Sequence, residues 1–127
     1  MASLTGITFQ VRVTDFEEGI RWYRLLFNRK PDFIPHEDFA EWEMVEGTWL
    51  QVAKGKPAEG SGPLRLGVEN IKKERSRLMD QLNLELEAVN TREGVPAAWL
   101  SFEDPYGNRL GLFQDLEKRP FREGEQG

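Results

Sequence analysis

Apolar and polar residues alternate near the start of this chain and then recur at helical spacing. Residues 7–13 alternate, which predicts a half-buried strand. Residues 16–27 carry large apolar side chains every three or four positions, which predicts an amphipathic helix. We expect Asp15 to cap this helix, with Glu18 placed as in a capping box, and Asn28 to end it in the left-handed conformation. The face expected to be buried consists of Phe16, Ile20, Tyr23 and Phe27.

Three short strands are expected next, at residues 32–34, 39–45 and 49–53. Glu46-Gly47 has the composition of the hairpin turn between the last two. The segment Lys54–Pro63 is rich in glycine, proline and lysine, so it is typical of a linker.

The same order of elements restarts after the linker. Residues 64–68 alternate as a strand, and Asn70 is the expected N-cap of a second helix. A weak strand is expected near 84–89, and stronger ones at 97–102 and 109–114. One side of the second helix is marked by Ile71, Arg75, Leu78 and Leu82.

The two halves, about 5–54 and 63–115, therefore each predict one strand, one helix and three more strands. This βαβββ repeat implies an α+β fold with pseudo-twofold geometry. We expect a curved mixed sheet in the form of a half-open barrel, with helices on its convex face and a concave cup between the halves. The prediction is one domain over 1–115 and a charged tail over 116–127; the alternative is an ordinary α+β domain without an internal repeat.

The segment 104–108 predicts a tight turn between the last two strands. Pro105 sets φ for the first central position, and Gly107 supplies a positive φ. Asp104 and Asn108 can hydrogen-bond the amides of the turn itself.

Composition narrows the choice of function. With 39% hydrophobic and 31% charged residues among 127, the chain is typical of a globular protein. No apolar run approaches the roughly 18–20 residues of a membrane helix, and no basic-then-apolar N-terminal segment predicts a signal peptide. The absence of cysteine excludes disulfides and thiolate metal sites, and a net charge of −5 disfavours nucleic-acid binding. We expect a cytoplasmic protein that binds neither membrane nor nucleic acid.

Two motifs carry a family resemblance. Val13-Thr14-Asp15-Phe16 with Ile20-Arg21-Trp22-Tyr23 opens the first helix, and Asp104-Pro105-Tyr106-Gly107-Asn108 forms the late turn. At these motifs the chain resembles the glyoxalase/bleomycin-resistance/extradiol-dioxygenase superfamily, also called the vicinal oxygen chelate superfamily. The resemblance extends from about Ile7 to Gln114 and implies the fold; function varies widely within it.

The resemblance also implies where metal ligands would lie, on the first and last strands of each half. These positions hold Thr8, Gln51, Pro63 and Gly111 in this chain. Proline and glycine have no side-chain ligand atom, and the only histidine is His36, in an expected loop, to which we assign no role. The sequence therefore predicts no metal, no cofactor and no catalytic residue, and argues against an enzyme.

Strand alternation places a second set of side chains in the expected cup. Large rings beside a few polar groups are typical of small-molecule sites; the alternative is that these rings pack in the core or at a dimer interface. Trp42 could not be placed, and Trp22 is expected to pack. The residues expected to bind a ligand are Thr8, Gln10, Trp49, Gln51, Arg65, Trp99, Arg109 and Phe113.

The favoured function is a metal-free, homodimeric protein that binds a planar or aromatic ligand, as the resemblance to bleomycin-resistance proteins implies. One alternative is a lyase, isomerase or dioxygenase-type enzyme with other catalytic residues. Another is an interaction module that binds no small molecule. The sequence does not name the ligand.

Overall fold

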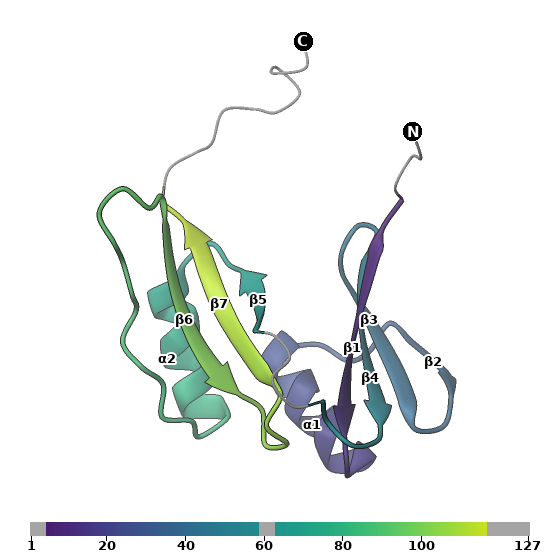
Figure 1. Cartoon of the computed structure of the whole chain (residues 1–127). Helices are drawn as coiled ribbons and strands as arrows, with labels where there is room; N and C mark the ends of the chain where they lie inside the picture. Colours follow the sequence, from purple (N-terminus) through teal and green to yellow (C-terminus); the bar gives the residue numbers. More distant parts are fainter. Residues whose placement is uncertain (1–4, 59–62, 117–127) are drawn as a thin grey trace. The chain divides into compact units, whose positions relative to one another are not determined.

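The computed structural model describes residues 5–58 and 63–116, and within them it contains two α-helices and seven β-strands. They fall into two compact units, each considered by itself here: Met1–Gly62 with Glu103–Asn108, and Pro63–Phe102 with Arg109–Gly127. The expected α+β class is confirmed. In chain order the elements are β1 (Ile7–Val13), α1 (Phe16–Phe27), β2 (Phe33–His36), β3 (Phe39–Val45), β4 (Thr48–Lys54), β5 (Leu64–Gly67), α2 (Ile71–Gln81), β6 (Ala97–Glu103) and β7 (Arg109–Asp115) (Figure 1).

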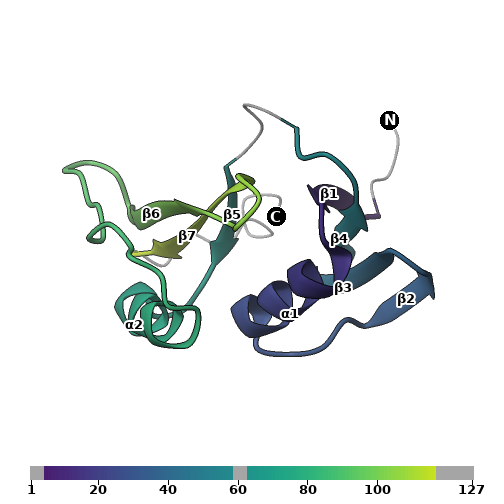
Figure 2. The ribbon, with the colours of Figure 1, turned by 90° about the horizontal axis from the view of Figure 1, so that it is seen from below.

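The first unit is a mixed four-stranded sheet in the order β1-β4-β3-β2. β1 runs parallel to β4, while β3 is antiparallel to both β4 and β2. Helix α1 covers one face of this sheet, as Figure 2 shows. The side chains buried under it include Val11, Leu50 and Trp42. The other face of the sheet has no helix on it in the described part of this unit.

Helix α1 begins and ends where the sequence predicts. The Asp15 side chain accepts a hydrogen bond from the Glu18 amide, and Asn28 is left-handed at φ 57°. The Glu18 carboxylate does not complete the capping box; it accepts from the Tyr106 hydroxyl at 2.7 Å. The buried face is also rotated from the one expected. Its fully buried members are Gly19, Trp22, Tyr23 and Leu26, with Phe16, Ile20 and Phe27 only partly covered.

Gly19 explains this rotation. A Cβ built at Gly19 would lie 2.7 Å from Cγ2 of Val13 on β1, so the helix approaches the strand most closely at this position. The buried side of the helix is therefore centred on Gly19, and Trp22, three residues further on, is buried with it. Trp22 packs edge-on against Tyr23 at 5.0 Å between ring centroids, which confirms its expected packing role.

The second unit contains a three-stranded sheet in the order β5-β7-β6, with β5 parallel to β7. Helix α2 covers one face of it (Figure 2). The Asn70 side chain accepts from the Lys73 amide at 3.0 Å, which confirms the predicted N-cap. Ile71 and Leu78 are the buried residues of the helix.

The weak strand expected near 84–89 does not form. One isolated bridge, between Asn90 and Trp99, takes its place. The guanidinium of Arg75 donates to the backbone carbonyls of Leu86 and Glu87, at 2.8 and 2.7 Å. The Glu87 carboxylate accepts from the Ser101 amide at 2.9 Å, so this part of the β6 edge is satisfied by a side chain.

The internal repeat is confirmed in the arrangement of its strands. In each unit the first strand lies parallel to the last, and the strand preceding the last lies on its other side. The second copy lacks the extra edge strand that β2 provides in the first. Residues 59–62 of the predicted linker and 117–127 of the predicted tail lie outside the described residues, and the boundary of a single domain at residue 115 stays a prediction.

The turn at 104–108 is held by one buried carboxylate. Asp104 is only 5% exposed. Its Oδ1 accepts from the amides of Tyr106 and Asn108 at 2.8 and 2.9 Å. Its Oδ2 accepts from the Asn108 side-chain amide and from the Tyr23 hydroxyl, both at 2.7 Å. Gly107 has φ 89°, as the turn prediction requires. Four donors thus replace the water lost by this carboxylate.

The same turn is fastened to the end of β1 and to the start of α1. The Asn108 side chain also donates to the Arg12 carbonyl at 2.8 Å, and the Tyr106 hydroxyl lies 3.1 Å from the Asp15 carbonyl. Burial and the neighbouring Asp104 carboxylate raise the pKa of Tyr23 well above its usual value, and burial together with Glu18 raises the pKa of Tyr106. Both tyrosines therefore stay neutral hydrogen-bond donors at physiological pH.

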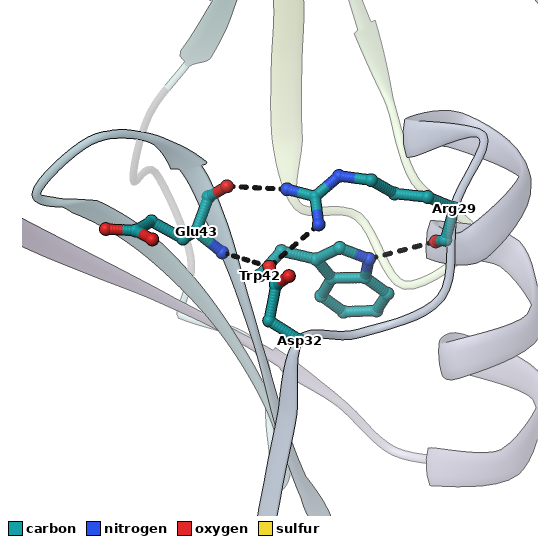
Figure 3. A network of polar contacts seen from close by, with 4 residues as sticks. All are labelled: Arg29, Asp32, Trp42 and Glu43. Carbon is teal, nitrogen blue, oxygen red and sulfur yellow. Dashed lines mark hydrogen bonds and ion pairs between the residues drawn. The ribbon is translucent and has the colours of Figure 1, made fainter.

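A second network fixes the chain after α1, as Figure 3 shows. The indole Nε1 of Trp42 donates to the Arg29 carbonyl at 3.0 Å. The Arg29 guanidinium donates to Asp32 Oδ2 at 2.7 Å and to the Glu43 carbonyl at 2.5 Å, while the Glu43 amide donates to Asp32 at 2.7 Å. Trp42, which the sequence left unplaced, is 0% exposed and belongs to the core.

We expect Tyr23→Phe to lower the free energy of unfolding by about 1–3 kcal/mol, because it removes one of the donors to a buried carboxylate. Urea denaturation measures the loss. Tyr106→Phe is the matched control: its hydroxyl bonds are exposed, so it should cost less than about 1 kcal/mol. Equal losses in the two variants would contradict the claim that the buried hydrogen bond to Asp104 stabilises the protein more than the exposed ones do.

Asp32 provides a pH-dependent prediction. Its hydrogen bonds from Arg29 and the Glu43 amide lower its pKa. Because the folded-state pKa is lowered, the stabilisation is present above the unfolded-state pKa and is lost as pH falls through the folded-state value. We expect Arg29→Gln to raise the Asp32 pKa in a carboxyl-detected NMR titration. An unchanged Asp32 pKa in that variant would show that Arg29 is not the main cause of its lowering.

Candidate functional site

The uncovered face of the first sheet is polar, as strand alternation predicted. Gln10 on β1 lies opposite Gln51 on β4, and Gln51 lies opposite Glu41 on β3. Thr8 and Gln10 are exposed, while Trp49 and Gln51 are partly covered. The four expected site residues of this half therefore share one sheet face.

Side-chain hydrogen bonds join these strands into a ladder. Arg12 Nε donates to Gln10 Oε1 at 3.2 Å. Gln10 Nε2 donates to Gln51 Oε1 at 3.2 Å, and Gln51 Nε2 donates to Glu41 Oε1 at 2.9 Å. We call this set, Arg12, Gln10, Gln51 and Glu41, the amide ladder. It begins at a cation and ends at an anion, so both amides are held in one orientation.

The uncovered face of the second sheet is organised around Arg65. A Cβ built at Gly111 would lie 2.9 Å from Cγ and 3.4 Å from Nε of Arg65, so the arginine side chain crosses directly over this glycine. Its Nη2 donates to Ser101 Oγ at 3.3 Å on β6. Arg65 thus spans all three strands of the sheet, from β5 across β7 to β6.

Aromatic rings lie on the same face. The Phe113 ring covers Gly67, where a Cβ would come within 2.8 Å of it. Trp99 shares the alternation of Ser101 on β6 and is partly covered. A hollow of about 500 Å³ borders Phe113 and is lined by Gly67, Val68, Glu69, Phe113, Gln114 and Asp115. Arg109 is exposed at the start of β7.

The predicted site residues thus lie in two sets, one on each sheet, and each set is coherent in itself. Three residues of the hydrogen-bond networks on these faces were not among the residues expected to bind a ligand. They are Arg12, Ser101 and Glu41; alternation puts Arg12 on the strand face of Gln10 and Ser101 on that of Trp99. The signal for Glu41 was available: it shares a strand face with Glu43, and β3 is the expected hairpin partner of β4.

The four positions implied for metal ligands do not fit a metal. Thr8 and Gln51 offer neutral oxygens, and Pro63 and Gly111 offer no side-chain donor. The Arg65 guanidinium lies over Gly111, so a positive charge already stands on the face that a cation would approach. Within residues 5–58 and 63–116 no three His, Cys, Asp or Glu side chains are grouped to hold an ion.

His36 lies on the edge strand β2, where a loop was expected. Its ring stacks on Phe39 with centroids 5.1 Å apart, and its Nδ1 lies 2.9 Å from the Glu37 carbonyl. It is exposed and has no contact with the amide ladder among the contacts of the described residues.

Comparison with solved structures gives the class of the fold. The chain is similar to a glyoxalase/bleomycin resistance protein from Catenulispora acidiphila, with 26% identity, a TM-score of 0.69, and coverage of 86% of this chain and 96% of that one. It also resembles a glyoxalase-related enzyme from Clostridium phytofermentans (13% identity, TM-score 0.72, coverage 90% and 97%). A third is the fosfomycin resistance protein FosX of Listeria monocytogenes (14% identity, TM-score 0.67, coverage 90% and 93%).

No model of a known protein family matches the sequence, and no curated protein matches it. The structural likeness nevertheless covers most of the chain and nearly all of each neighbour. The chain therefore has the fold of the vicinal oxygen chelate superfamily, to which the glyoxalase, bleomycin-resistance and fosfomycin-resistance proteins belong, and the sequence resemblance is confirmed. Neither helix in the described residues is long and apolar enough to cross a membrane.

We expect Gly111→Ala to destabilise the protein by about 1–3 kcal/mol, since its Cβ would lie 2.5 Å from the rigid Leu100 carbonyl as well as against Arg65. Thermal or urea unfolding measures this loss. Gly67→Ala is the control, because its Cβ meets only the far end of the Phe113 ring, which can turn aside. A Gly111→Ala variant as stable as the parent would remove the steric argument at this position.

Proposed function

We propose that this protein binds a planar small molecule carrying an anionic group, without a metal, on an uncovered sheet face, with the face of the second sheet that carries Arg65 as the main candidate. The observation that supports it most is the position of Arg65. The cation lies over Gly111, one of the positions at which the superfamily resemblance implies a metal ligand. A guanidinium at that position offers the ligand a fixed positive charge.

The geometry of Arg65 suits an oxyanion. A guanidinium has five N–H donors in a planar fork, and one side-chain acceptor, Ser101 Oγ, engages it at 3.3 Å. The stem is held against Gly111, so less rotamer freedom remains to be lost when a ligand binds. Paired N–H groups favour a carboxylate, phosphate or phosphonate.

The neighbouring rings support a planar ligand body. Trp99 and Phe113 are partly covered on the same face as Arg65, and Trp49 is partly covered beside the amide ladder. Aromatic faces bind flat rings by stacking and exclude water from polar contacts. On the first sheet, taken by itself, Gln10 and Gln51 would supply hydrogen bonds of fixed direction to a ligand bound there, since the amide ladder orients both.

The names of the structural neighbours agree with small-molecule binding. They include bleomycin resistance and fosfomycin resistance proteins. One FosX structure contains Mn(II) and a dihydroxypropylphosphonic acid. The residues of the present chain do not reproduce a metal site, so we propose that Arg65 supplies the positive charge for an anionic ligand here. We further propose that the protein is a cytoplasmic homodimer; analytical ultracentrifugation tests the oligomeric state.

The test is a screen of aromatic carboxylates, aryl phosphonates and glycopeptide-like drugs. We expect tryptophan quenching and a rise in melting temperature with an aromatic acid, and an affinity at least tenfold weaker in Arg65→Gln. Arg92→Gln, in the loop before β6, is the matched control and should bind as the parent does. Trp49→Phe and Trp99→Phe report which sheet face the ligand covers.

Elemental analysis of the purified protein accompanies the screen. Stoichiometric bound transition metal would contradict the metal-independent proposal and favour the enzyme alternative. If the aromatic acids cause neither quenching nor a melting shift, the binding proposal fails and the interaction-module alternative is favoured.

A further inference from the structure

A second hollow lies in the first unit, on the far end of α1 from Asp15. Its volume is about 490 Å³. It is formed by the last turns of the helix and the chain that follows it. The residues that line it are Arg21, Arg24, Leu25, Arg29 and Lys30. We call it the basic hollow; it contains none of the site residues described above.

Helical spacing brings the first cations together. Arg21 and Arg24 are three residues apart, and Leu25 is four from Arg21, so the three share one side of α1. Asn28 turns the chain through a left-handed conformation, which brings Arg29 and Lys30 to the rim of the same hollow. Leu25 is 43% exposed among them.

Most of this charge is unpaired. Arg29 is paired with Asp32 at 2.7 Å, so one carboxylate offsets one of the four cations. Arg21, Arg24 and Lys30 form no ion pair with any residue of 5–58 or 63–116. The net charge of the whole chain is −5, so a hollow lined by three cations without an ion-pair partner is opposite in sign to the rest of the molecule.

One wall of the hollow, at Arg29, is held in place. The Arg29 carbonyl accepts from the buried Trp42 indole, and the Arg29 guanidinium is fixed to the Glu43 carbonyl (Figure 3). The Arg29 amide donates to the Arg24 carbonyl at 3.2 Å, which joins the two walls. A preformed wall lowers the ordering cost of binding.

One effect opposes an anion here, the partial negative charge at the C-terminus of a helix, equivalent to roughly half an elementary charge. Part of it is already satisfied, because the amides of Asn28 and Arg29 both donate to the Arg24 carbonyl. Three unpaired cations exceed that half charge several-fold, so the local field favours an anion.

We propose that the basic hollow binds a compact anion bearing two linked phosphate groups, either free diphosphate or the diphosphate of a nucleotide. Its volume falls within the range of roughly 300–1,000 Å³ typical of small-ligand pockets. Several converging cations distinguish a multiply charged phosphate from a single carboxylate, and arginine binds phosphate oxygens in pairs. The overall acidic charge opposes a long polyanion such as nucleic acid.

The experiment is an NMR and calorimetric titration of the full chain with magnesium-free pyrophosphate, and in parallel with ADP and with sulfate. We expect shifts confined to 21–30, binding by pyrophosphate that weakens steeply with salt, and much weaker binding by sulfate. ADP tighter than pyrophosphate identifies a nucleotide; equal affinities identify the diphosphate alone. The double variant Arg21→Gln/Arg24→Gln should weaken binding at least tenfold.

Lys72→Gln/Lys73→Gln, which removes two charges from α2, is the matched control and should leave binding unchanged. An equal loss in both double variants, or sulfate binding as tightly as pyrophosphate, would show a non-specific charge effect and overturn the proposal. Arg65→Gln separates this site from the sheet faces: if it abolishes pyrophosphate binding, the anion binds there and the basic hollow is not its site. Binding of an acidic peptide but not of pyrophosphate would overturn the proposal as well.

Discussion

The hydrogen bonds to the buried carboxylate of Asp104 are the interaction on which the late turn and its attachment within the first unit depend. The turn that contains it belongs with the first unit, while the strands that it joins, β6 and β7, belong to the second. Asp104 collects four donors from within the turn and from α1, and no cation neutralises it among its described contacts. Removing any one of these four donors would leave a buried carboxylate with an unsatisfied oxygen, which lowers stability. This explains why so many hydrogen bonds meet in a five-residue turn.

The helix ends and the late turn could be predicted from the sequence because each depends on residues close together in the chain. N-caps, the left-handed Asn28 and the positive φ of Gly107 are each decided by a few neighbouring residues. Alternation then assigned the two faces of β1, β4, β5, β6 and β7. Even the role of Asp104 was partly visible, since an aspartate preceding Pro-Tyr-Gly-Asn closes its own turn; its bond to Tyr23, 81 residues away, was not.

What the sequence did not give depends on distant partners. The rotation of α1 follows from the approach of Gly19 to Val13, and periodicity alone cannot choose between two apolar stripes on one helix. The strand expected near 84–89 is replaced because Arg75 and Glu87 satisfy backbone groups with side chains. Glu41 was not predicted as part of the site, because its contact with Gln51 depends on the strand register that places the two residues opposite each other.

Gly111 decides two properties of the uncovered face of the second sheet together. A glycine there removes a side-chain ligand, and the same missing Cβ leaves the space that the Arg65 side chain occupies. Placing a larger residue at position 111 needs more than one change, because any side chain there meets both the Leu100 carbonyl and Arg65. The absence of a side-chain donor at position 111 and the placement of the Arg65 cation are therefore coupled by sterics.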